Sequence, residues 1–219
     1  MGQANKIFIS KGDLFMWKKR IAFLIIFVFM VVSLCACGKS KLNLNNYVIE
    51  KRENLFTAND SLYSVTFSTG TRESNYNFDG IVNEMVPFGV LTISRNDNLP
   101  MANDTYSYAV IINDQTYNGF LENNGNNSYS ADLETTATND AIISVQISFT
   151  GYQNLENASS NFQVDNATAL NIAQKELKEN INNLLSDKNV KIEVVTKIMK
   201  DHSNEDLKSY YWYVNCSSI

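Results

Sequence analysis

Thiols and imidazoles, the side chains best suited to nucleophilic or metal chemistry, are few in this 219-residue sequence. The cysteines are Cys35, Cys37 and Cys216, and the only histidine is His202. One histidine excludes the usual multi-histidine zinc sites and leaves a single possible base for a Ser-His-Asp triad. His202 lies in the polar segment KDHSNED, where a solvated surface position is the better interpretation. The chemistry that the sequence favours therefore concerns the cysteines.

The segment that precedes Cys35 has the pattern of a secretory signal. Residues 18–20 (KKR) are a compact positive cluster, and residues 21–34 are an uncharged apolar run. A short apolar run after a basic cluster is typical of a signal peptide. A membrane-spanning helix needs about 20 apolar residues, so an uncleaved anchor is the weaker alternative. Residues 1–15 fit no part of a signal, and Met16 is an alternative translation start.

The residues Leu34-Cys35-Ala36-Cys37 resemble the lipobox of bacterial lipoproteins. That motif has an aliphatic residue three positions before the modified cysteine and a small residue directly before it. Cys37 fits, whereas Cys35 directly follows the large Leu34. The resemblance implies that residues 1–36 are removed and that Cys37 becomes the lipid-bearing first residue. It also implies a protein on the extracytoplasmic face of the cell membrane, attached through that lipid.

Removal of the signal would change the charge and the thiol count. Residues 1–36 carry five of the 18 bases and one of the 23 acids, so the remainder has 13 bases and 22 acids, a net charge near −9. Such a chain has no electrostatic reason to bind nucleic acid or anionic lipid. Cys216 would be the only unmodified thiol, which excludes an internal disulfide. A buried structural role is its favoured interpretation, ahead of a nucleophile or an intermolecular bridge.

Residues 37–46 are predicted to be a polar tether, and residues 47–153 a β domain. Strand-forming segments recur there with turn residues between them and without a helical period, which is typical of an antiparallel sandwich or barrel. We predict a β-sandwich of immunoglobulin-like architecture. The tight turn Asn113-Asp114 joins two of its strands. The predicted strands are residues 62–68, 88–94, 106–114, 115–122, 128–134 and 141–149.

Residues 154–163 are predicted to be a linker, and residues 164–219 a small helix-plus-β-sheet module. Asp165 can cap a helix that continues to about residue 187. Apolar residues at spacings of 3, 4, 4 and 3 form one stripe along it. Two strands, 190–199 and 210–218, should follow. The predicted class is therefore α+β. The stripe residues are Leu170, Ala173, Leu177, Ile181 and Leu184.

The C-terminal module resembles PepSY modules of secreted bacterial proteins. In those modules a helix with regularly spaced small and apolar residues precedes strands with an aromatic core. PepSY modules usually continue into a further strand, so this copy is expected to be minimal or truncated, with an unpaired edge. The residues that carry the resemblance are Ala167, Leu170, Ala173, Leu177, Tyr211, Tyr213 and Val214.

Two further groups could bind a ligand. The aromatic run Tyr210-Tyr211-Trp212-Tyr213 is either a binding platform or, more often on a two-faced strand, partly core. Residues 96–174 contain no Lys or Arg and nine acids. Within this stretch, residues 95–104 could contribute oxygen ligands to a weak calcium site. They lack EF-hand spacing, so a solvated acidic face is favoured and no metal or cofactor is expected.

The function predicted from these observations is that of a non-catalytic surface lipoprotein. Its partners would be the membrane, through Cys37, and a protein or cell-envelope component. The alternative implied by the PepSY resemblance is a modulator of a secreted peptidase or an envelope-assembly factor. An enzyme is not supported, because no phosphate-binding loop, histidine cluster or nucleophile elbow is present.

Overall fold

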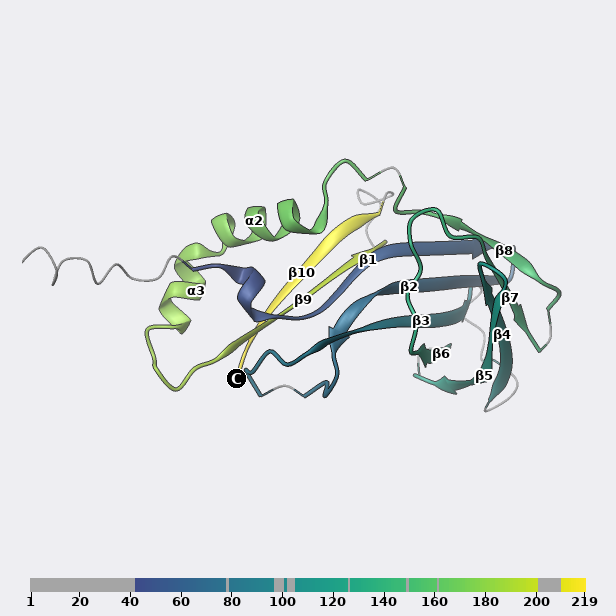
Figure 1. The fold of residues 1–219 in the computed structure, drawn as a ribbon, viewed down its shortest axis with the longest axis horizontal. Coiled ribbons are helices and arrows are strands. Elements are labelled where there is room, and N and C mark those ends of the chain that lie inside the picture. The colour runs from purple at the N-terminus through teal and green to yellow at the C-terminus, as the bar shows by residue number, and fades with distance from the viewer. Residues whose placement is uncertain are drawn as a thin grey trace, which may run out of the picture. The chain divides into compact units, whose positions relative to one another are not determined.

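The computed structural model describes residues 42–77, 79–96, 101, 105–125, 127–148, 150–160, 162–200 and 210–219. Residues 43–219 form one compact unit (Figure 1). Its elements are η1 (Leu44–Tyr47), β1 (Val48–Asn59), β2 (Tyr63–Glu73), β3 (Met85–Arg95), β4 (Tyr106–Ile112), β5 (Gln115–Asn123), β6 (Ser128–Leu133), β7 (Ile143–Ile147), β8 (Gln153–Asn157), α2 (Asn166–Glu176), α3 (Lys178–Leu184), β9 (Ile192–Met199) and β10 (Tyr211–Ser218).

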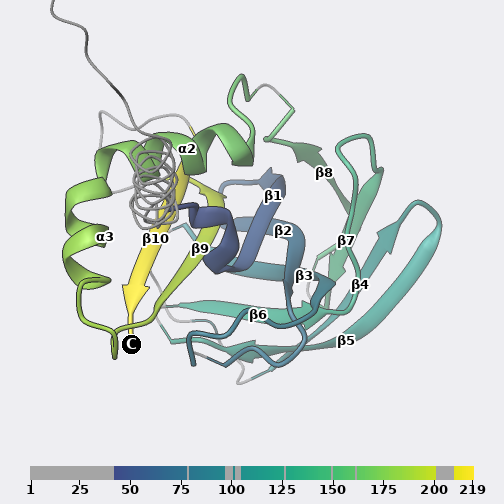
Figure 2. The same cartoon turned by 60° about the vertical axis from the view of Figure 1, so that its left-hand side comes forward.

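Eight of the described strands close into an antiparallel barrel. Their order is β1-β2-β3-β6-β5-β4-β7-β8, and β8 pairs back onto β1 (Figure 2). The closing pair places Phe56 opposite Asn157 and Thr57 opposite Glu156. Closure pairs strands that would otherwise be at the edges of an open sheet.

The prediction of an α+β fold with an immunoglobulin-like β-sandwich and a separate helix-plus-sheet module is therefore wrong. A sandwich needs two sheets packed face to face, whereas here β8 joins β1 and the sheet closes on itself. The last two strands do not form a sheet of their own, because β9 pairs parallel to β1. The fold is mainly β, with two short helices among the described residues.

Strand β1 divides one of its edges between two partners. Its first half pairs with β9, with Val48 opposite Val194, and its second half pairs with β8. The change of partner coincides with a bulge between Arg52 and Asn54 in the pairing with β2. A bulge bends its strand and increases the local twist, which lets one strand serve two pairings.

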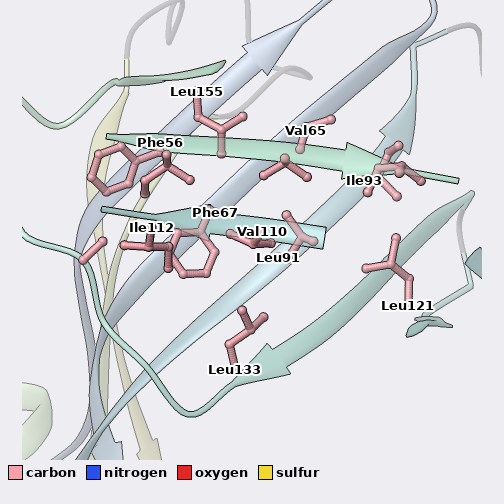
Figure 3. Packing of buried hydrophobic residues seen from close by; sticks show 14 of the residues in the cluster. Phe56, Val65, Phe67, Leu91, Ile93, Val110, Ile112, Leu121, Leu133 and Leu155 are labelled. Carbon is pink, nitrogen blue, oxygen red and sulfur yellow. The ribbon is translucent and has the colours of Figure 1, made fainter. Parts of the chain in front are cut away.

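The barrel interior is filled by alternate apolar residues of its strands (Figure 3). Strand β7 lies within the predicted strand 141–149, and its residues Ile143, Val145 and Ile147 are each 1% exposed. Phe56 and Phe67 lie opposite each other on β1 and β2 and are completely buried. Burial of each such side chain contributes about 1.5–3 kcal/mol to stability.

The predicted turn at Asn113-Asp114 is confirmed. Both residues have positive φ, 46° and 71°, and they connect β4 directly to β5. A two-residue hairpin turn of this kind matches the right-handed twist of the strands, and Asn and Asp tolerate the left-handed conformation.

The helical segment begins where the sequence predicts and is interrupted once. The side chain of Asp165 accepts a hydrogen bond from Thr168 N at 2.8 Å, which caps α2. The single predicted helix is found as α2 and α3, which are separated at Leu177. Within the stripe, Leu170 and Ile181 are buried, whereas Leu184 is exposed.

The predicted domain limits remain predictions. Strand β8 occupies the first residues of the range assigned to the linker, and η1 begins inside the range assigned to the tether. Helix α2 is connected to the start of the compact unit, because Leu44 N donates to Gln174 Oε1 at 3.0 Å. At its N-terminal end, Asn166 Nδ2 donates to Thr196 Oγ1 of β9 at 2.6 Å.

Candidate functional site

Two hollows border the segment that connects β8 to α2. Residues Phe162, Gln163 and Val164 of this segment, together with Trp212 of β10, line both hollows. We call the two hollows together the Trp212 cleft. Because one wall is common to both, a ligand of suitable size could contact both at once.

Trp212 is held firmly in this shared wall. Its indole Nε1 donates to the carbonyl oxygen of Val164 at 2.7 Å. The ring of Phe162 meets it edge to face, with centroids 6.3 Å apart and an interplanar angle of 84°. A buried indole N–H usually finds a partner, and an edge-to-face aromatic pair adds about 0.5–1.5 kcal/mol. The connecting segment is therefore fixed against β10.

The first hollow is apolar and has a volume of about 510 Å³. It lies between α2 and β10, and Ile172 of α2 is 52% exposed at its wall. Besides the four residues of the shared wall, it is lined by Ala169, Ile172, Ala173, Tyr211 and Val214.

The second hollow is polar and has a volume of about 600 Å³. Hydroxyl, amide and carboxylate side chains dominate its wall, and its described lining contains no Lys, Arg or His. Such a wall disfavours anionic ligands and suits neutral groups that exchange hydrogen bonds with amides and hydroxyls. Besides the shared wall, it is lined by Glu53, Asn54, Thr138, Asn139, Ser159, Asp165, Asn166, Thr168 and Ile198.

Hydrogen bonds between loops and strands position the polar wall. Asn157 Nδ2 donates to the carbonyl oxygen of Asn139 at 2.5 Å, and Ser159 Oγ donates to Asn157 Oδ1 at 2.5 Å. Ser159 Oγ in turn accepts from Leu55 N of β1 at 3.2 Å. Asn54 Nδ2 donates to a backbone carbonyl oxygen of the loop between β6 and β7 at 2.8 Å. The wall is therefore tied to the barrel.

Asp165 provides negative charge in the lining of the polar hollow. Its carboxyl is hydrogen-bonded to the side chain of Thr168, which has the larger effect, and to the backbone of Thr168. Both hydrogen bonds hold the pKa of the carboxyl below the ordinary value. These hydrogen bonds favour the charged form, so Asp165 is ionised at neutral pH. It strengthens the preference for neutral or cationic groups in this hollow.

A second cluster of charged groups lies where β1, β2 and β9 meet. Glu50 is 2% exposed, and its Oε1 accepts from Arg52 Nε at 2.6 Å. Burial, followed by the charge of Glu50, raises the pKa of Tyr76 to about 12. Glu193 is also buried and accepts from Gly80 N at 2.5 Å. These contacts attach the β2–β3 loop to the sheet.

The predicted lipobox, Leu34, Cys35, Ala36 and Cys37, lies outside the described residues, and so does His202. Cys216 is half-buried on β10, and burial raises the pKa of its thiol. A thiol with a raised pKa is mostly protonated at neutral pH and is a poor nucleophile.

Tyr210, Tyr211 and Trp212 of the aromatic run are half-buried, and Tyr213 is exposed. Tyr210 donates its hydroxyl to Thr57 Oγ1 at 3.4 Å, and Trp212 belongs to the cleft. Tyr213 is 39% exposed beneath Lys197 Nζ, which lies 5.3 Å from the ring centroid. The sequence did not single out Phe162, Gln163 or Asn139, because they lie in segments that were assigned to a linker and a turn.

Residues 96–174 contain no Lys or Arg, and the described acids among them are all exposed, as a solvated acidic face requires. Within the described part of the chain, no group of three or more His, Cys, Asp or Glu side chains could hold a metal ion. The segment suggested for calcium, residues 95–104, lies mostly outside the described residues. The exposed acids are Asp114, Glu122, Asp132, Glu134, Asp140, Glu156 and Asp165.

Comparisons with family models, curated proteins and solved structures find no match for this chain. None of the helices in the described ranges combines the length and apolar character that crossing a membrane requires.

Proposed function

We propose that this protein is a lipid-anchored, extracytoplasmic binding protein without catalytic activity, and that it holds a neutral glycan of the cell envelope in the Trp212 cleft. The observation that carries the proposal is the pairing of an aromatic wall with a polar hollow whose described lining has no cationic side chain. Binding sites typically combine apolar surface with a few polar groups that fix orientation. Sugars offer both an apolar ring face and hydroxyl or amide groups.

The lipid anchor is the part of the proposal that rests on the sequence. Replacing Cys37 by alanine is expected to abolish incorporation of radiolabelled palmitate and to prevent membrane attachment, because acyl chains supply the membrane affinity of a net-negative chain. The matched variant Cys35→Ala should keep its label. Equal loss of label in both variants would show that the wrong cysteine was chosen.

Glycan binding can be followed through a built-in reporter. The chain has two tryptophans, Trp17 and Trp212, and only Trp212 remains if residues 1–36 are removed. We therefore expect soluble, uncharged N-acetylated oligosaccharides from bacterial cell wall to change the fluorescence of the lipidated protein in mild detergent, with saturation.

The Gln163→Ala variant tests whether that signal comes from the cleft. Gln163 is exposed and lines both hollows, so its removal should not affect folding. Loss of one hydrogen bond, about 1 kcal/mol, predicts about fivefold weaker binding. The control is Gln115→Ala, the same change at an exposed position of β5 outside the cleft. The absence of a saturable signal, or an equal weakening of binding by both variants, would refute the glycan proposal. The lipid anchor would still be tested separately, by palmitate labelling.

A PepSY-type modulator of a secreted peptidase is the second candidate. It is supported by the element order of the C-terminal segment, in which helices α2 and α3 precede the antiparallel strands β9 and β10. This candidate predicts that the purified protein changes the hydrolysis rate of a peptidase secreted by the same bacterium. A glycan-binding protein should leave that rate unchanged.

A further inference from the structure

Among the described residues, β10 is paired on only one side. It is the terminal strand of the sheet order, and all eight of its residues pair with β9 without a shift of register. Pairing continues to Ile219, whose backbone N–H and carbonyl bond to Lys191 at 2.9 and 3.1 Å. A regular ladder of this kind directs alternate N–H and C=O groups away from β9, where another strand could accept them.

Strand β10 also lacks the features that usually protect an edge. Its sequence, YWYVNCSS, contains no charged residue and no proline, and no bulge interrupts its pairing. Tyr213 of the strand itself is 39% exposed, and Ile172, across the apolar hollow, is 52% exposed. Long, uncharged edges of this kind are pairing sites.

The strand is complementary to itself when two copies run antiparallel. Its first half is aromatic and its second half is small. A two-fold axis at Val214 places Tyr211 opposite Ser217, and Trp212 opposite Cys216. Tyr213 then faces Asn215, so each large side chain meets a smaller one. Such a contact uses the same patch on both subunits, which is the geometry of a closed dimer.

We propose that a second copy of this chain pairs antiparallel with β10 around Val214, so that one continuous sheet runs through the dimer. The occupant is a second copy because the strand carries this size complementarity, and because its neutrality lets two net-negative chains approach. The proposal does not depend on the lipid anchor or on the glycan.

The oligomeric state of the full chain in mild detergent tests the proposal. Sedimentation equilibrium should give the mass of a dimer. Asn215→Lys places two like charges near the axis and should weaken dimerisation at least about tenfold, because like charges across paired strands are destabilising. The matched control is Asn154→Lys at an exposed position of β8, which has strands on both sides. A wild-type monomer, or a dimer that resists Asn215→Lys, would overturn the proposal.

Cross-linking tests the register independently of any folding defect. In a chain that carries Cys35→Ser, Cys37→Ser and Cys216→Ser, the Val214→Cys variant should be joined efficiently to its copy by a short bismaleimide. In a chain that carries only Cys35→Ser and Cys37→Ser, Cys216 should not be joined to its copy. Its counterpart would lie four residues away along the ladder, about 14 Å at the rise of a strand. Preferential cross-linking through Cys216, or none in a dimeric sample of the Val214→Cys variant, would refute pairing around Val214.

Discussion

Replacing Phe67 by alanine should lower the free energy of unfolding by about 4 kcal/mol. The Phe67 ring is completely buried in the barrel, opposite Phe56 and beside Gly89 of β3, whose lack of a side chain makes room for it. A Cβ at Gly89 would lie 2.6 Å from Cε2 of the ring. Neighbours packed this closely cannot easily move into the cavity. Urea titration followed by circular dichroism measures the change.

The control for this prediction is the same substitution on the outside of the barrel. Phe120 of β5 is 70% exposed, so Phe120→Ala removes a strand-forming side chain without opening a cavity. Its cost should stay below about 1 kcal/mol. Similar losses in the two variants would mean that the barrel interior does not supply the stability assigned to it.

The second large effect is expected from one added methyl group, in Gly70→Ala. Gly70 lies on β2 opposite Arg52, beside the bulge in β1. An added Cβ would overlap the carbonyl oxygen of Lys51 and lie 3.0 Å from the Cα of Arg52. Both are backbone atoms, so relief requires movement of β1. We expect a loss of about 3 kcal/mol in unfolding free energy, at the upper end of the usual overpacking cost.

Gly151→Ala is the matched control, because a Cβ at Gly151 would meet no atom within 4 Å and its backbone does not require positive φ. Surface changes of this kind stay within about 0.5 kcal/mol. Thermal melting of both variants checks the pair. If Gly70→Ala were as mild as Gly151→Ala, the close approach of β1 and β2 at the bulge would be wrong.

Strands with apolar alternation were recognisable in the sequence, whereas the strand that organises the fold was not. Most of β1 reads as polar, because Glu50, Lys51, Arg52 and Glu53 occupy its first half. In the structure Glu50 is buried and paired with Arg52. Hydropathy cannot reveal a buried charge whose partner is two residues away, so this strand escaped prediction.

The closure of the barrel could not be predicted from the sequence either, for a related reason. Strand β8 has the sequence QNLEN, in which only Leu155 is buried. One apolar residue among amides suggests a linker, as predicted. Its strand conformation comes from partners on both sides, β7 and β1. Such long-range pairing leaves no local pattern.

Only part of the candidate site could be predicted. The aromatic run that contains Trp212 was singled out as a possible platform, and the Asp165 cap was recognised from its position before an apolar stripe. The polar wall, with Asn54 and Asn139, comes from segments far apart in the sequence that the barrel brings together. The types and spacing of polar residues in turns do not indicate which of them will line the same surface of the folded protein.

The divided edge of β1 has a consequence for the order of folding. As the chain emerges from its N-terminus, β1 can form a hairpin with β2 at once, but the partner of Phe56 on the other edge is Asn157, much later in the chain. The partner of Val48 is Val194, later still. Contacts so distant in sequence slow folding, and a nascent hairpin with an open edge can pair with the wrong chain. The polar first half of β1 should protect it during that interval, so its charged residues would serve the unfinished chain as well as the native one.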